Sequence, residues 1–152
     1  MEHVRTFGSR GSEQGQLSYP TGIAINEDAV YVSEGGNHRI SVFTKKGAFE
    51  RTFGERGEAL GGSLHEPKGL TFVNGWLLVV ESKRISIFSP NGEPQQTLSL
   101  PGAGHLWGCC AAGSDEGDMY AYVTDLRAGN AKVQCEELVL AACKAAASPQ
   151  LY

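Results

Sequence analysis

The chain has 152 residues, enough for one ordinary domain, and its 41% hydrophobic and 20% charged residues are typical of a globular protein. Its net charge of −4 disfavours a partner that is held mainly through phosphate contacts. No stretch reaches the roughly 18 apolar residues that cross a bilayer, and the first residues lack the apolar segment of a secretory signal. We therefore expect a cytoplasmic protein whose four cysteines are reduced, with no membrane partner.

The first repeating unit, residues 7–54, predicts four short strands at about 21–26, 29–34, 39–44 and 48–53. Apolar residues, many of them β-branched or aromatic, alternate along these segments, which is the pattern of half-buried strands. Residues that favour turns separate the strands. These separators are Asn26-Glu27-Asp28 and Lys45-Lys46-Gly47.

The second unit, residues 53–98, repeats the first in the same order. Phe53-Gly54 matches Phe7-Gly8, which stands 46 positions earlier. Further matches are Pro20 with Pro67, Gly22 with Gly69, Arg39 with Arg84 and Gly47 with Gly92. Asn74-Gly75 suits a two-residue hairpin. This unit is two residues shorter between its second and third strands, so we expect a tighter loop there.

A fainter third unit covers residues 99–136. Tyr122-Val123-Thr124-Asp125 resembles Tyr31-Val32-Ser33-Glu34, and Trp107-Gly108 stands where the other units have Pro-x-Gly. The tail, residues 137–152, is rich in Ala and Leu and contains Pro149, which favours a short helix or a frayed end over a further strand.

Four strands per unit and a period of about 40–50 residues are the signature of propeller blades. We therefore predict an all-β fold with about three four-stranded antiparallel blades over residues 1–136, followed by the tail. Propellers typically have four to eight blades, so the prediction is a partial propeller. A fragment of a longer propeller, a degenerate product and a wedge that self-associates through its exposed blade faces all remain open. Residues 4–8 resemble residues 50–54, so they predict the outer strand of a further blade.

The repeated motif resembles a known family. The run P-x-G-I-A-I, then V-Y-V-S-E-G-G-N-H-R-I-S-V-F, a glycine turn and F-x-x-x-F-G is similar to the NHL repeat. The likeness is strong over residues 7–98 and weaker over residues 99–136. It implies a β-propeller, of the six-bladed TolB-like type when complete. It also implies partner recognition, as in scaffolds and ubiquitin-ligase proteins, with RNA binding as a second use.

An acidic residue ends the second strand of each unit, and a basic residue begins the third strand. The pairs are Glu34 with Arg39, Glu81 with Arg84 and Asp125 with Lys132. A residue that recurs in every unit usually serves the unit, so we expect structural ion pairs. A ring of carboxylates that binds a cation or a basic partner is the alternative.

The candidate binding residues are polar and basic groups expected in loops. They are Asn37, His38, Arg39, Lys45, Lys46, Lys68, Lys83 and Arg84. We expect His38 to pack or cap within its loop, because no His or Cys spacing indicates a metal site. No nucleophile elbow or phosphate-binding glycine loop occurs, so we expect no catalytic residues, no metal and no cofactor. Cys109 and Cys110 are expected to pack as small apolar residues.

A protein-interaction module is the favoured function, because propeller loops vary freely on a rigid scaffold. The alternative is RNA binding by a basic face, with Tyr19 or Trp76 stacking on bases. The acidic net charge disfavours this alternative. A fragment of a propeller lyase or hydrolase is the third possibility. We do not predict an enzyme.

Overall fold

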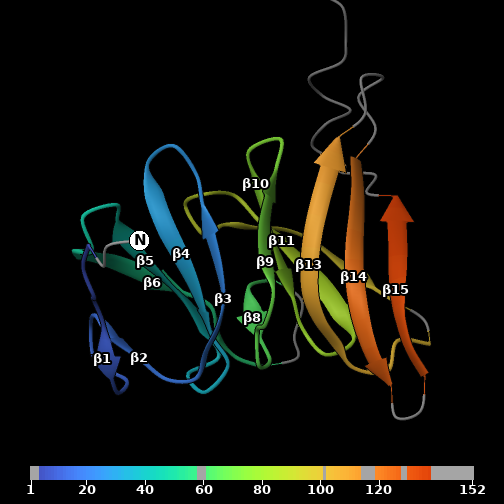
Figure 1. The fold of residues 1–152 in the computed structure, drawn as a ribbon, viewed down its shortest axis with the longest axis horizontal. Coiled ribbons are helices and arrows are strands. Elements are labelled where there is room, and N and C mark those ends of the chain that lie inside the picture. The colour runs from blue at the N-terminus through green and yellow to red at the C-terminus, as the bar shows by residue number, and fades with distance from the viewer. Residues whose placement is uncertain (1–3, 58–60, 101, 114–118, 128–129, 138–152) are drawn as a thin grey trace, which may run out of the picture.

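The computed structural model describes residues 4–57, 61–100, 102–113, 119–127 and 130–137. Its three largest sheets are antiparallel meanders that stand side by side as propeller blades (Figure 1). Blade 1 contains β3 (Pro20–Ile25), β4 (Ala29–Glu34), β5 (Arg39–Thr44) and β6 (Phe49–Phe53). Blade 2 contains β9 (Leu70–Val73), β10 (Trp76–Val80), β11 (Arg84–Phe88) and β12 (Pro94–Ser99). The predicted all-β partial propeller is confirmed.

Blade 3 shows three strands within the described residues. They are β13 (Leu106–Gly113), β14 (Met119–Arg127) and β15 (Asn130–Glu137). The fourth strand expected for this blade is not among the described residues. The helical or frayed tail expected over residues 137–152 also lies outside the described residues, apart from Glu137, which ends β15. The division into three repeats and a tail therefore stays a prediction. Within the described part of the chain, no helix is long and apolar enough to cross a membrane.

The turns form as their residues predict. The Asn26 side chain accepts the amides of Asp28 and Ala29 at 2.9 and 2.8 Å, which closes the turn between β3 and β4. Asn74 and Gly75 have φ values of 46° and 81°, the left-handed conformation that a two-residue hairpin requires.

A short parallel pair of strands precedes each of the first two blades. β1 (Ser9–Arg10) pairs with β2 (Gln16–Leu17) before blade 1, and β7 (Glu55–Arg56) pairs with β8 (Ser63–Leu64) before blade 2. The outer strand predicted over residues 4–8 does not form in this structure. An outer strand needs a neighbour in its own blade, and the described residues supply none there.

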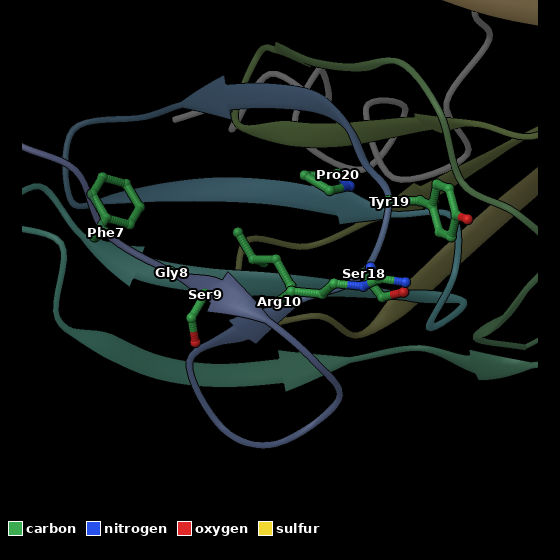
Figure 2. A pocket seen from close by; sticks show the side chains of 8 residues that line it. Phe7, Gly8, Ser9, Arg10, Ser18, Tyr19 and Pro20 are labelled. Carbon is green, nitrogen blue, oxygen red and sulfur yellow. The ribbon is translucent and has the colours of Figure 1, made fainter.

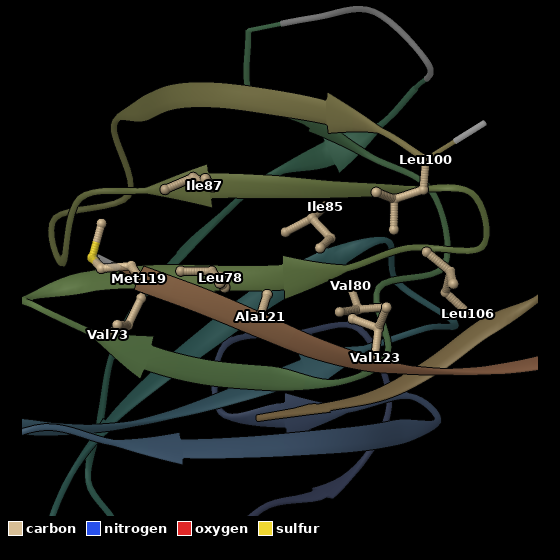
Figure 3. Close-up of a cluster of buried hydrophobic side chains, with 10 residues drawn as sticks. All are labelled: Val73, Leu78, Val80, Ile85, Ile87, Leu100, Leu106, Met119, Ala121 and Val123. Carbon is tan, nitrogen blue, oxygen red and sulfur yellow. The ribbon is translucent and has the colours of Figure 1, made fainter. Parts of the chain in front are cut away.

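Apolar side chains fill the spaces between blades. One cluster joins blade 1 to blade 2 and includes Tyr31 and Leu70. Another joins blade 2 to blade 3, where Val80 lies beside Val123 (Figure 3). A meander with two apolar faces cannot bury both alone, and stacking the blades buries them.

The inner strands of neighbouring blades come so close that glycine is required. A Cβ on Gly22 would collide with the carbonyl oxygen of Lys68. A Cβ on Gly69 would lie 2.7 Å from the carbonyl oxygen of Trp107. The Pro-x-Gly element of the first two repeats thus sets the distance between neighbouring blades.

Candidate binding site

The strands of each blade run alternately up and down, so each blade has two ends. The turns after β3 and β9 lie at the upper end in Figure 1. The loops between β4 and β5, and between β10 and β11, lie at the lower end. The chain also enters the innermost strands β3, β9 and β13 at this lower end, which we call the entry end.

Equivalent side chains from all three blades line a hollow of about 390 Å³ at the entry end. They flank Pro20, Pro67 and Leu106, which are equivalent positions in the three repeats. We name this the entry hollow and define it by Tyr19, Thr21, Glu66, Lys68, His105 and Trp107. Blade 1 contributes the first two residues, blade 2 the next two and blade 3 the last two.

Lys68 lies between its blade 3 neighbours in the hollow. Its Nζ is 2.6 Å from Nε2 of His105 and 4.6 Å from the centroid of the Trp107 ring. Only 4% of the residue is exposed. Burial lowers the pKa of the Lys68 amine, and the nearby Glu66 carboxylate opposes that effect. The contact with the Trp107 ring is a cation–π interaction.

His38, in the loop between β4 and β5 of blade 1, forms contacts with blade 2. Its Nδ1 accepts the amide of Glu66 at 3.1 Å, and its ring centroid lies 5.5 Å from that of His65. Burial lowers the pKa of His38, and the charges of Arg56 and His65 lower it further. The neutral ring is the form that can accept this hydrogen bond.

The backbone holds the entry residues in an uncommon conformation. Tyr19 and Glu66, which are equivalent in the repeat, both have a φ of 48°, where side chains other than glycine are rare. The Tyr19 carbonyl accepts the Gly35 amide at 3.0 Å, and 74% of the tyrosine is exposed. Strain of this kind is typical of positions that the surrounding structure fixes.

The repeated acids are the anchors of that conformation. Glu34 is fully buried, and its Oε2 accepts the amide of Ser18 at 2.8 Å and the side-chain amide of Asn37 at 2.6 Å. Its Oε1 accepts Nε of Arg39 at 2.8 Å. Arg39 then donates to the carbonyl oxygens of Ser12 and Glu13, in the loop between β1 and β2, and of Gln16, the first residue of β2.

Blades 2 and 3 repeat the arrangement. Oε2 of Glu81 accepts the amide of His65 at 2.7 Å and Nη2 of Arg84 at 2.8 Å. The Asp125 carboxylate accepts the amide of His105 at 2.8 Å. Lys132 is paired with Asp125 in the register of β14 and β15, and its side chain is exposed. In every blade the buried acid therefore holds the backbone beside the entry hollow.

The remaining basic residues do not gather into one face. Lys45 and Lys46 are exposed in the turn between β5 and β6, at the opposite end from the entry hollow. Lys83 is exposed near the entry end. Arg39 and Arg84 are held by their carboxylates. Lys45 and Lys46 thus lie apart from the other basic residues of the alternative RNA-binding face.

The structure also gives the positions of Trp76 and of the two neighbouring cysteines, Cys109 and Cys110. Trp76 packs against the cluster between blades 2 and 3, so it does not accompany Tyr19. Cys109 packs against the same cluster, and burial, with a smaller effect of Cys110, raises the pKa of its thiol to about 12. Cys110 is exposed, and both thiols are free. In the described ranges, no three His, Cys, Asp or Glu side chains could together hold a metal ion.

A second hollow lies on the outer face of blade 1. It has a volume of about 510 Å³ and is bordered by the segment around β1 and by the start of β3 (Figure 2). Phe7, Arg10, Leu17, Tyr19 and Pro20 are among its lining residues.

Comparison with known proteins supports the repeat assignment. The NHL repeat family matches residues 17–43. The chain carries an NHL repeat. Protein brain tumor of Drosophila melanogaster is 42% identical over 53 residues, which are 34% of this chain and 5% of that protein. RING finger protein nhl-1 of Caenorhabditis elegans is 41% identical over 56 residues, which are 36% of this chain and 6% of that protein. The matches thus span a small part of these NHL-repeat relatives.

A solved structure supports the architecture. The β-propeller domain of Cps50 (Swd1) from Myceliophteria thermophila superposes with a TM-score of 0.51 at 11% identity. The superposition covers 88% of this chain and 44% of that one. At this identity the likeness concerns the fold alone.

Sequence reasoning did not assemble the entry hollow. The sequence marks Lys68 as a candidate binding residue and Tyr19 as a stacking residue, but its patterns do not connect Glu66, His105 and Trp107 to the same site. A signal for them was available. Glu66 and His105 directly precede Pro67 and Leu106, as Tyr19 precedes Pro20, and Trp107 directly follows Leu106, as Lys68 follows Pro67.

Proposed function

We propose that this chain is a protein-binding module whose recognition surface is the entry hollow. One observation carries the proposal. The residues that build the blades repeat from unit to unit, whereas the residues that line the hollow at equivalent positions differ in every unit. A repeated position serves the blade, and a position that varies on a constant scaffold is free to serve recognition.

The chemistry of the hollow suits a peptide. Tyr19 and Trp107 are 74% and 43% exposed, and they offer flat surfaces to an apolar or aromatic side chain. Glu66, Lys68 and His105 supply hydrogen-bonding groups between them. One formal positive charge and one negative charge balance each other there, so the hollow lacks the excess positive charge that a nucleic acid backbone requires.

We further propose that the module binds its partner without catalysing a reaction, and that it does so in the cytoplasm. Among the chain's relatives is a RING finger protein, which supports partner recognition in a ubiquitin-ligase setting. The partner recognised by the entry hollow would then be the protein that such a ligase modifies.

Selection from two random libraries tests the proposal. The immobilised full chain is offered a displayed peptide library and, separately, a random single-stranded RNA library at about 150 mM salt. We expect peptides to be enriched, and we expect Trp107→Ala to abolish their capture while Lys45→Ala, at the opposite end, leaves it unchanged. Far-UV circular dichroism checks that both variants are folded. Enrichment of RNA alone, or peptide capture that survives Trp107→Ala, would overturn the proposal.

A further inference from the structure

The outer face of blade 1 is built as an interface between blades. Ile23 and Ile25 on β3 point to this face and are 61% and 59% exposed. Leu70, which occupies the position of Ile23 in blade 2, is only 6% exposed because blade 1 covers it. The second hollow, beside Pro20, lies on the same face (Figure 2).

The outer face of blade 3 is the opposite half of such an interface. Tyr122 is 39% exposed, whereas Tyr31 at the same position of blade 1 is 1% exposed beneath blade 2. Val133 is 65% exposed, whereas its equivalent Ile40 is completely buried. Blade 3 therefore presents the kind of face that receives the next blade, and blade 1 presents the kind of face that docks onto a preceding blade.

The glycines of the inner strands show the same difference. Gly22 and Gly69 each lie against backbone of the following blade, where a side chain would collide. A Cβ on the equivalent Gly108 would meet, among the described residues, only Oγ1 of Thr124 in its own blade, at 3.4 Å. Blade 3 thus has glycine at the position where the first two blades approach their neighbours closely. Among the described residues, no further blade of the same chain lies next to Gly108.

We infer that two copies of this chain associate head to tail, so that the outer face of blade 3 in each copy covers the outer face of blade 1 in the other. The carbonyl at Thr21 of the second copy would then approach Gly108, as that of Lys68 approaches Gly22. Both halves of the interface are on one chain, and each continues an interface that the chain already makes internally. Two copies related by a twofold axis cover all four faces, and the six blades fall within the usual four to eight.

The chemistry of the two faces fits this partner. The exposed side chains Ile23 and Ile25 of one face and Tyr122 and Val133 of the other are uncharged, and large exposed apolar areas are rare on isolated monomers. The proposal goes beyond the binding function, because it uses the blade faces and leaves the entry hollow open. A chain that does not form dimers could therefore still bind a peptide, and a chain that binds no peptide could still form dimers.

Light scattering coupled to size exclusion tests the association. We expect a mass of two chains of 16.2 kDa each for the full chain at about 50 µM. Ile23→Lys and Gly108→Val should each reduce the mass to one chain, and Gln95→Lys, on the exposed strand β12, should not. Circular dichroism and thermal melting establish that each variant is folded. A one-chain mass for the unchanged protein, a mass above two chains, or a two-chain mass in both face variants would overturn the inference.

A disulfide test establishes the orientation. Ala24 and Leu70 share the cluster between blades 1 and 2, and their equivalents at the proposed interface are Cys110 and Ile23. Ile23→Cys should therefore form an intermolecular disulfide under mild oxidation, and adding Cys110→Ser should remove it. A dimer linked through Cys110 in the unchanged chain would show that two blade 3 faces meet each other, which contradicts the head-to-tail arrangement.

Discussion

Nε of Arg39 lies 2.8 Å from Oε1 of the fully buried Glu34. The pair does more than join two strands, because the same carboxylate holds the amide of Ser18 next to the entry hollow. The repeated acid thus couples the stability of the blade to the shape of its binding end.

Glu34→Ala should lower the free energy of unfolding by about 3 kcal/mol, because it removes the carboxylate that pairs with the Arg39 guanidinium and accepts the Ser18 amide. Glu50→Ala is the matched control. Glu50 pairs with Arg51 at 3.3 Å, but both side chains are more than a third exposed, so the loss should be below about 0.5 kcal/mol. Urea denaturation of the three proteins measures both values. Equal midpoints for Glu34→Ala and Glu50→Ala would refute the anchoring role.

Gly22→Ala should destabilise the chain by about 1–3 kcal/mol, because the added methyl group collides with the backbone of blade 2. Gly108→Ala is its positional counterpart in blade 3 and should change the stability of the single chain by less than about 0.5 kcal/mol. Thermal melting provides the comparison, at a dilution where light scattering gives a one-chain mass. A larger loss for Gly108→Ala than for Gly22→Ala would contradict the packing of the inner strands described above.

The stability should fall as the pH is lowered through the titration range of His38. The pKa of His38 is lowered in the folded chain, so below about pH 6.5 the unfolded chain binds a proton that the folded chain does not. His38→Asn retains a side-chain acceptor for the Glu66 amide without titrating. Its unfolding free energy should therefore decline less between about pH 7.5 and 5.5. Parallel pH profiles for the two proteins would show that His38 titrates normally.

Single-stranded RNA should bind no more tightly than the non-specific range known for duplex DNA, roughly 10⁻⁴–10⁻⁶ M at physiological salt. The reason is that Lys45 and Lys46 lie at the opposite end from Lys83, while Arg39 and Arg84 are engaged by carboxylates. Fluorescence anisotropy at about 150 mM salt measures the affinity. Nanomolar binding that is lost in Lys45→Ala and Lys46→Ala would restore RNA as the ligand.

The strands and turns could be predicted from local patterns. Alternation placed the strands of blade 1 within about one residue, and Asn74-Gly75 specified its hairpin, because period and turn chemistry are properties of neighbouring residues. The pairing of Glu34 with Arg39 was also foreseeable, since both recur in the repeat.

The entry hollow could not be read from the same patterns. Lys68, His105 and Trp107 are separated along the chain and meet only because consecutive blades stack with equivalent ends aligned. The sequence gives no measure of the direction in which each side chain leaves its strand. The position of Lys45 and Lys46 at the opposite end from Lys83 could not be predicted either, because it depends on which turns of a meander share an end.

The most direct test of the binding proposal is the affinity of a peptide selected by the full chain for a matched set of variants. Tyr19→Ala and Trp107→Ala should each weaken binding by about tenfold or more, since each removes an exposed aromatic surface that contributes about 1.4 kcal/mol or more. Lys46→Ala should leave the dissociation constant unchanged. If the three variants bind the peptide as tightly as the unchanged chain does, the entry hollow is not the recognition surface.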